Sequence, residues 1–170
     1  MAESIKTYTV VIYTENSIGL LSQIANVFTR RNLNILSLSA GESAEEGSYH
    51  ITVVTDGTER NVRGAALLVE KRVDVIRVDY YTDSEIVYKE LAMYKVPTKS
   101  LLESGSMEKL LSRHQAKIVD INKKFTVIQK TGTAEDTSAL LEDLKDYGIC
   151  EFIRSGRIAV SKQWNAEEAE

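Results

Sequence analysis

An internal repeat constrains this fold more than any other feature, because one order of strands and helices occurs twice within the 170 residues. Runs of period two, typical of strands, alternate with apolar residues spaced three and four apart, typical of helices. In the first half the order is strand, helix, strand, strand, helix, strand, at 8–13, 20–31, 35–40, 48–54, 59–69 and 73–81. The second half repeats this order at 88–96, 100–114, 118–121, 125–128, 134–147 and 150–153, and 158–160 forms a further short strand.

The repeat predicts the α+β class, with two ferredoxin-like βαββαβ domains in tandem over residues 1–82 and 83–170. Right-handed crossovers place both helices of a unit on one face of its sheet. Units of roughly 80 residues are marginal in size for a lone core. Because one sheet face and the sheet edges stay uncovered, we expect the chain to associate at least as a dimer.

Cap and turn residues mark the boundaries of the predicted helices. Thr58 and Thr133 precede helical runs and can accept hydrogen bonds from free backbone N–H groups, and Asp136 completes a capping box with Thr133. Asn32 is the expected stop of the first helix. Gly105 lies inside the third predicted helix, where it would cost about 1 kcal/mol relative to alanine.

The charge balance disfavours a nucleic-acid partner. The chain has 21 Lys and Arg against 25 Asp and Glu, a net charge of -4, whereas binding to a phosphate backbone requires a basic surface. No apolar run approaches the ~18 residues of a membrane helix, and no secretory signal is visible at the N-terminus. The single cysteine, Cys150, cannot close an intramolecular disulfide, which fits a reducing compartment. We therefore expect a cytoplasmic protein that binds neither nucleic acid nor membrane.

The residues that catalytic sites need are scarce. Two histidines, His50 and His114, lie far apart in the sequence, and Cys150 has neither a second cysteine nor a nearby histidine. A Cys/His metal cage and a redox pair are therefore excluded. The phosphate-cradling motifs G-x-x-x-x-G-K-[ST] and G-x-G-x-x-G are missing. These features predict a chain that is not an enzyme and holds no metal or cofactor of its own.

The most informative segment is 16–21, where the first strand ends and the first helix begins. Free N–H groups at a helix start suit a carboxylate. Gly19 lets a ligand approach the backbone closely, and Asn16 offers both a donor and an acceptor. The turn could hold the carboxylate and ammonium of an amino acid, with Leu21 and Ile35 lining a pocket for its side chain.

A purely structural interpretation of the same segment is also open. Asn16 or Ser17 would cap the helix through a side-chain oxygen, and Gly19 would serve only the turn.

Motifs in both halves resemble the small subunits of acetolactate synthase, also called acetohydroxyacid synthase. The run Glu15–Ser22 is similar to the E-N-x-x-G-x-L-S stretch that opens the ACT domain of this family. Further similar segments, in matching order, are N-I-x-S-L at 34–38, V-D-V-x-x-V at 73–78, a strand opening at 88–91 and E-x-x-R-[ST]-G at 151–156. The resemblance extends from about Lys6 to Lys162.

The resemblance implies a non-catalytic regulatory subunit of branched-chain amino acid biosynthesis, on the routes to valine and isoleucine. Its partner would be a large catalytic subunit that carries thiamine diphosphate, Mg²⁺ and FAD. The N-terminal domain would be an ACT domain that forms a homodimer and binds valine, the feedback inhibitor, between two protomers. The valine-binding residues carried over from the family motifs would be Asn16, Gly19, Leu20 and Leu21 of one protomer and Asn34 and Ile35 of the other.

Some positions depart from the family pattern, which leaves the identity and strength of the effector open. Asn32 stands where the family often has glycine, and Leu36 stands where it often has glutamate. His50 falls in a strand segment that replaces a commoner family sequence, and we interpret it as structural. Trp164, near the C-terminus, either packs on the second domain or touches the large subunit.

Two other functions compete with this interpretation. RNA-recognition domains share the βαββαβ order, but their aromatic strand motif is absent from 48–55 and the chain is acidic. A stand-alone ACT-type amino-acid sensor could regulate another enzyme or a transcription factor. Co-purification with a thiamine-dependent large subunit distinguishes a synthase subunit from such a sensor.

Overall fold

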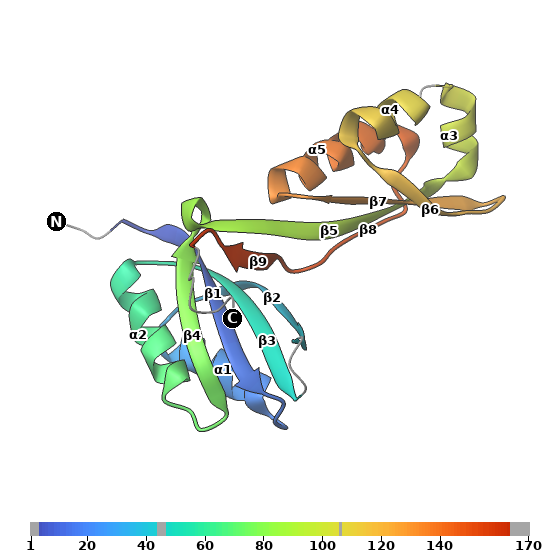
Figure 1. The fold of residues 1–170 in the computed structure, drawn as a ribbon. Coiled ribbons are helices and arrows are strands. Elements are labelled where there is room, and N and C mark those ends of the chain that lie inside the picture. The colour runs from blue at the N-terminus through green and yellow to red at the C-terminus, as the bar shows by residue number, and fades with distance from the viewer. Residues whose placement is uncertain (1–3, 44–46, 106, 164–170) are drawn as a thin grey trace. The chain divides into compact units, whose positions relative to one another are not determined.

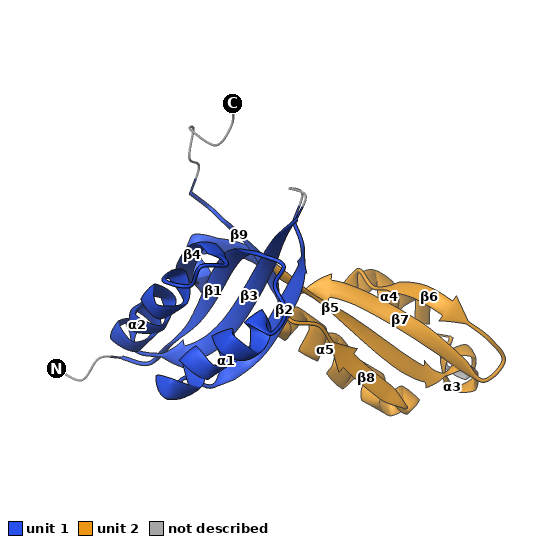
Figure 2. Ribbon diagram, turned by 90° about the horizontal axis from the view of Figure 1, so that it is seen from below, with its two compact units in different colours: residues 1–88, 157–170 blue, residues 89–156 orange. Residues whose placement is uncertain are grey.

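The computed structural model describes residues 4–43, 47–105 and 107–163, which form two compact units (Figure 1, Figure 2). Unit 1 contains the chain up to Tyr88 together with the segment from Arg157 onward, and unit 2 contains residues 89–156. Trp164, for which we predicted a packing or docking contact, lies outside the described residues.

Unit 1 has the predicted order of strands and helices. Its elements are β1 (Lys6–Glu15), α1 (Leu20–Arg30), β2 (Ile35–Glu42), β3 (Ser48–Gly57), α2 (Glu59–Glu70) and β4 (Val75–Thr82). The antiparallel sheet has the strand order β2-β3-β1-β4, so β2 and β4 form its edges. Both helices cover one face of this sheet (Figure 1). β4 begins at Val75 rather than at the predicted Val73, whose side chain is fully exposed ahead of the strand.

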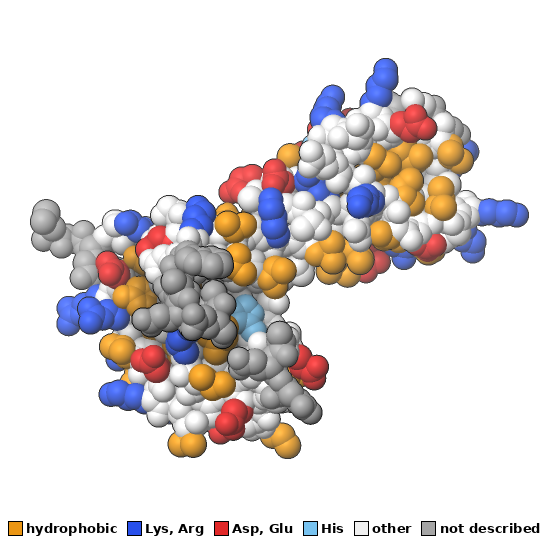
Figure 3. Space-filling view, in the orientation of Figure 1, with side chains coloured by type: hydrophobic (Ala, Val, Ile, Leu, Met, Phe, Trp, Pro, Cys, Tyr) orange, Lys and Arg blue, Asp and Glu red, His pale blue; other side chains and the backbone are white. Residues whose placement is uncertain are grey.

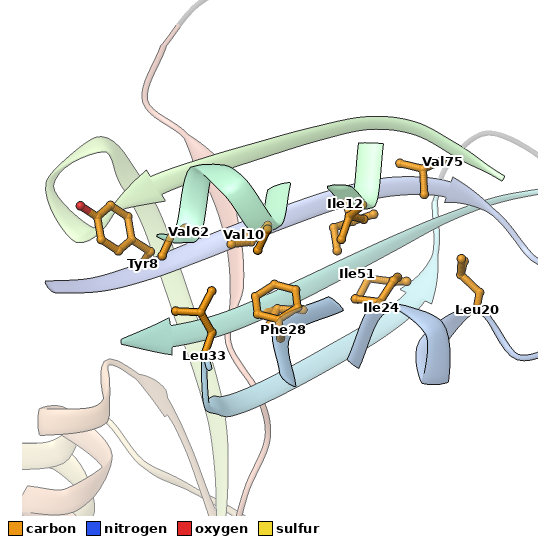
Figure 4. Packing of buried hydrophobic residues seen from close by; sticks show 13 residues of the cluster. Tyr8, Val10, Ile12, Leu20, Ile24, Phe28, Leu33, Ile51, Val62 and Val75 are labelled. Carbon is orange, nitrogen blue, oxygen red and sulfur yellow. The ribbon is translucent and has the colours of Figure 1, made fainter. Parts of the chain in front are cut away.

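The core of unit 1 lies between the sheet and its two helices. Alternate residues of β1, namely Tyr8, Val10 and Ile12, belong to one buried cluster with Ile24 and Phe28 of α1 (Figure 4). The period of two in the strand and the spacing of four in the helix thus converge on one layer. Burying a large apolar side chain contributes about 1.5–3 kcal/mol, so this layer fixes α1 and the loop in front of it.

Unit 2 repeats the topology of unit 1. Its elements are β5 (Ile86–Pro97, which starts in unit 1), α3 (Thr98–Ser104), α4 (Met107–His114), β6 (Lys117–Ile121), β7 (Phe125–Gly132), α5 (Ala134–Leu144) and β8 (Glu151–Arg154). The sheet order β6-β7-β5-β8 is that of unit 1. Short 3₁₀ turns, η1 (Asp83–Glu85) and η2 (Lys145–Tyr147), precede β5 and follow α5. The predicted class, α+β with two ferredoxin-like domains in tandem, is confirmed.

The predicted single helix over 100–114 is wrong, because two helices, α3 and α4, occupy this stretch. Gly105 ends α3 with φ +60, in the left-handed region that glycine favours. It is therefore a helix terminus rather than an interior residue, and the cost expected for an interior glycine does not arise.

The predicted helix boundaries are confirmed at three positions. Thr58 Oγ1 accepts a hydrogen bond from Asn61 N at 3.3 Å. Thr133 and Asp136 form the predicted capping box, in which Thr133 N donates to Asp136 Oδ2 at 2.9 Å. Asn32 follows α1 with φ +55, a conformation that only glycine and asparagine or aspartate adopt readily. This explains how asparagine can replace the glycine common at this position in the family that the motifs resemble.

The segment after residue 156 packs in unit 1, although the sequence placed it in the range 83–170. Arg157 is buried, and its Nη1 donates to Asp83 Oδ1 at 2.7 Å and to Thr9 Oγ1 at 3.2 Å. Its guanidinium lies 3.9 Å from the centre of the Tyr88 ring. β9 (Ile158–Ser161), the further short strand that we predicted, pairs with β5. Arg157 and Thr9 are 148 positions apart, so no local sequence pattern predicts that the segment after residue 156 packs in unit 1.

Candidate anion-binding site at the first helix

The loop 16–19 joins β1 to α1 and ends in a left-handed residue. Gly19 occupies the N-cap position of α1 with φ +82. A Cβ added at Gly19 would meet only Gln23 Nε2, at 3.9 Å, so space is not what requires glycine here. The requirement is conformational, since L-residues rarely adopt this φ.

No side chain among the residues that the structure describes caps α1. The cap that the structural interpretation assigned to Asn16 or Ser17 is therefore wrong. The Ser17 hydroxyl instead donates to Asp74 Oδ2 at 3.0 Å, which takes it away from the helix start.

The start of α1 leaves backbone donors without helical acceptors. Gln23 N donates to Gly19 O at 3.1 Å, the first bond of the α-helical pattern. Leu21 N and Ser22 N precede Gln23, and helix geometry gives them no carbonyl four residues back within the helix. Free donors of this kind form a site for an anion.

The first turn of α1 also differs in charge from the first turns of the other long helices. α2, α4 and α5 begin with the acids Glu59, Glu108, and Glu135 with Asp136, whereas α1 has no acid there. An anion near a helix N-terminus is stabilised by about 0.3–1 kcal/mol through the helix dipole. Among the described helices of eight or more residues, α1 alone keeps this potential available to a ligand.

Asp74 anchors the loop from the residue before β4. Its carbonyl accepts hydrogen bonds from Thr14 Oγ1 and from Glu15 N, the latter at 2.9 Å, and its carboxylate holds Ser17. In the sequence, Asp74 appeared only as a member of the V-D-V motif, with no part in the site. No local pattern could have signalled this role, because Ser17 and Asp74 are 57 positions apart.

Four of the predicted site residues lie at this helix start. Asn16 and Gly19 are exposed, and Leu21 is 45% exposed. Leu20, in contrast, is 4% exposed because its side chain belongs to the core of unit 1. Leu20 can therefore contribute to ligand binding only through its backbone.

The other two predicted residues, Asn34 and Ile35, lie at the far end of the same sheet. Thr55 Oγ1 donates to Asn34 O at 2.8 Å, and Ile35 pairs with Thr55 of β3. Glu15, which leads into the loop, pairs with Ser48 at the opposite end of β3. Ser48 and Thr55 are seven residues apart in β3, or about 23 Å at a rise of roughly 3.3 Å per residue. One chain therefore does not bring the six predicted residues together.

The part of the chain that the structure describes shows neither a metal site nor a membrane-spanning helix. Among residues 4–43, 47–105 and 107–163, no three His, Cys, Asp or Glu side chains gather as a metal site requires. Within the same residues, no helix has the length and apolar character to span a bilayer.

Burial lowers the pKa of His50, whose ring lies 5.2 Å from the ring of Tyr13 in β1. A neutral ring packed against a tyrosine agrees with a structural role for His50.

Family models match both units. Residues 11–77 match the acetohydroxyacid synthase small subunit-like ACT domain, and residues 89–163 match the model described as the small subunit of acetolactate synthase. The first match identifies the N-terminal domain as an ACT domain, as predicted.

Full-length relatives agree with both matches. The chain is 31% identical to the probable acetolactate synthase small subunit of Methanothermobacter thermautotrophicus, over 92% of this chain and 93% of that protein. It is 34% identical to the acetolactate synthase small subunit of Bacillus subtilis, over 86% of each. The crystal structure of the acetolactate synthase small subunit from Thermotoga maritima has the same fold, with a TM-score of 0.83 at 24% identity, over 95% of this chain and 99% of that one. The chain therefore belongs to the family of acetolactate synthase small subunits, the family that its motifs resemble.

Proposed function

We propose that this protein is the regulatory subunit of an acetolactate synthase, which activates a large catalytic subunit and makes it sensitive to feedback inhibition by valine. Family membership supports the catalytic partner, and the uncompensated N-terminus of α1 supports the effector. The large subunit would bind the thiamine diphosphate, Mg²⁺ and FAD. The chain itself would act in the cytoplasm as a non-catalytic part of branched-chain amino acid biosynthesis.

The observation that carries the effector proposal is the start of α1. The valine carboxylate would accept hydrogen bonds from Leu21 N and Ser22 N, where the helix dipole and the lack of an acidic first turn both favour an anion. The exposed amide oxygen of Asn16 would accept from the ammonium group. The exposed side chain of Leu21 would contact the isopropyl group.

A homodimer paired through β2, an edge strand of unit 1, would complete this site. In antiparallel pairing about a two-fold axis, the start of one β2 lies beside the end of the other. The end of β2, at Glu42, lies beside the first residues of β3, and these pair with the end of β1 that leads into the loop 16–19. Asn34 and Ile35 of one protomer would then approach the loop of its partner.

A site shared between protomers would let valine act on the catalytic subunit from a distance. Valine bound there would stabilise the paired arrangement of the ACT domains that forms the site. A ligand shifts an equilibrium only through its different affinities for the two states. Inhibition therefore requires that the arrangement favoured by valine be the one that activates the large subunit less.

Reconstitution with the large subunit tests the proposal. Acetolactate formation is measured for the pure chain, for the large subunit and for their mixture over a valine titration, with alanine as the control. We expect no turnover by the pure chain, a gain in activity on mixing, and a partial loss of that gain with valine but not with alanine.

Each part of the proposal fails separately. Acetolactate formation by the pure chain would refute the regulatory role, and an activated mixture indifferent to valine would refute the effector. A chain that binds valine in calorimetric titration but forms no complex with a thiamine-dependent large subunit would instead be a stand-alone sensor.

A further inference from the structure

The strand β6 is an open sheet edge in unit 2. Among the described residues its one partner strand is β7, and all five of its residues are exposed. Ile118, Val119 and Ile121 are 36%, 47% and 54% exposed, and hydrophobic side chains gather over this part of unit 2 (Figure 3). An edge with exposed β-branched residues is a template for another strand.

A bulge places the two charged residues of β6 on the same face of the sheet. Lys117 pairs with Gln129 and Asp120 with Val127, and the register shifts between Ile118 and Asp120. Because Gln129 and Val127 are alternate residues of β7, they point to one face, and Lys117 and Asp120 point to that face too. The spacing of three residues would otherwise have put the two charges on opposite faces.

The edge strand β2 of unit 1 carries the same irregularity. Its register shifts between Ile35 and Ser37, and the bulged residue Leu36 is 51% exposed, like Val119 in β6. Both strands occupy the same place in their sheets, at the edge next to the third strand of the unit. Because we propose that β2 pairs with β2 of a second protomer, the repetition favours the same kind of contact at β6.

We propose that β6 pairs antiparallel with β6 of a second copy of this chain. With the two-fold axis between Ile118 and Val119, Lys117 of each copy lies across from Asp120 of the other, on the same face of the joined sheet. Two reciprocal ion pairs form, and Ile118 lies beside Val119 of the other copy. The strand is thus complementary to itself, as a two-fold interface requires.

The signs of the two charges decide between this contact and a protected edge. Proteins often place charges and bulges on edge strands to prevent pairing. Like charges facing each other across the axis would serve that purpose, whereas Lys117 and Asp120 face each other with opposite signs. The contact involves neither valine nor the catalytic subunit, so it goes beyond the proposed function, and changes at Lys117 and Asp120 test it without altering β2.

Two single charge changes and their mixture test the pairing. In Lys117→Asp two carboxylates face each other at both positions, and in Asp120→Lys two ammonium groups do so. We expect each variant to associate roughly tenfold more weakly than the wild type, because cross-strand charge pairs each contribute up to about 1 kcal/mol. In an equimolar mixture, opposite charges face each other again, so unlike chains should regain the association. The measurement is sedimentation equilibrium of the full chain over a concentration series.

Matched controls carry the same charge changes outside β6. Lys123→Asp and Asp146→Lys lie at exposed positions of unit 2 and should leave association unchanged. If Lys117→Asp and Asp120→Lys associate like the wild type, the pairing is overturned. This also holds if the two variants lose affinity for the catalytic subunit, because β6 would then dock that subunit rather than a second copy. Weaker association in both variants without recovery in the mixture would overturn it as well, since the loss would then reflect damage to unit 2.

Discussion

The two units share one topology but differ at the turn that follows their first strand. In unit 1 the loop 16–19 separates β1 from α1, whereas in unit 2 β5 ends at Pro97 and α3 begins at Thr98 with no intervening loop. Thr98 is buried, and its hydroxyl lies 2.7 Å from Asn122 O, to which it donates, and 2.9 Å from Thr126 Oγ1. This turn of unit 2 is thus closed by hydrogen bonds within the unit.

The different turns after β1 and β5 show that the ferredoxin-like topology does not by itself make a ligand site. Unit 1 adds a loop long enough to hold Gly19 in a left-handed conformation, followed by a helix start that no described side chain caps and whose first turn has no acid. In unit 2, α5 shows the opposite arrangement, because Thr133 and Asp136 cap its start. Under our proposal, one fold used twice serves once for an effector and once as a structural and associating domain.

Gly19→Asp should have the largest effect on the proposed valine site, the feature that distinguishes unit 1 from unit 2. A side-chain carboxylate about 4 Å from the bound valine carboxylate would cost about 4 kcal/mol at an effective dielectric of 20, nearly a thousandfold in affinity. We expect valine inhibition to disappear and activation of the large subunit to remain. The measurement is the valine midpoint for acetolactate formation by the reconstituted pair.

Gly19→Asn is the matched control for that variant. Asparagine has nearly the size of aspartate and bears the same backbone strain at φ +82, but it has no charge. It should lose far less valine affinity. Equal losses in the two variants would assign the effect to strain, and a wild-type midpoint in Gly19→Asp would exclude the loop as the effector site.

Valine should stabilise unit 1 and leave unit 2 unchanged. A ligand at about 100 times its Kd that binds only the native state adds about 2.7 kcal/mol to the free energy of unfolding. Hydrogen exchange should slow in peptides from 4–43 and not in those from 107–156, and the thermal midpoint should rise with valine but not with alanine. Protection confined to unit 2 would place the effector site outside the ACT domain.

The sequence predicts the topology well because the signals for topology are local. Strand and helix periods identify the elements, and the caps at Thr58 and Thr133 lie within a few residues of the N–H groups they satisfy. The site is less accessible to such reasoning. Ser17 has the chemistry of an N-cap, yet its hydroxyl binds Asp74, and this contact between distant positions decides its role. The helical spacing of Leu20 from Ile24 and Phe28 does predict that Leu20 faces the core, whereas the family motif assigned it to the valine site.

Ser17→Ala should have a smaller effect on valine than either change at Gly19. It removes the hydrogen bond that ties the loop to Asp74 but leaves every backbone donor and the Asp74 charge in place. One such bond contributes about 1 kcal/mol to the free energy of unfolding, so we expect stability to fall by about that amount and valine affinity, which depends on the position of the loop, to fall by no more than about fivefold. Calorimetric titration measures the affinity. Ser22→Ala, at an exposed position of α1, is the control and should bind valine like the wild type, since its N–H is retained.

The smallest expected effect lies at the start of α5, which side chains cap, unlike the start of α1. Asp136→Ala removes the carboxylate that accepts from Thr133 N at 2.9 Å, and losing such a capping interaction costs about 1 kcal/mol near neutral pH. Urea unfolding of the full chain, followed by circular dichroism, measures this loss. Asp146→Ala removes an exposed acid in η2, the turn that follows α5, and should change stability less.

The pH dependence of that loss isolates the contribution of the carboxylate. The hydrogen bond from Thr133 N lowers the pKa of Asp136 below its ordinary value of 3.8. A group whose pKa is lowered by folding stabilises the protein fully above its unfolded-state pKa and loses that contribution as the pH falls through its folded-state pKa. The stability difference between the wild type and Asp136→Ala should therefore stay constant near neutral pH, shrink below about pH 4 and vanish once the folded protein is protonated at Asp136. A difference that persists at the lowest pH would mean that Asp136 stabilises α5 through packing, and the contrast in charge between the starts of α5 and α1 would then lose its energetic basis.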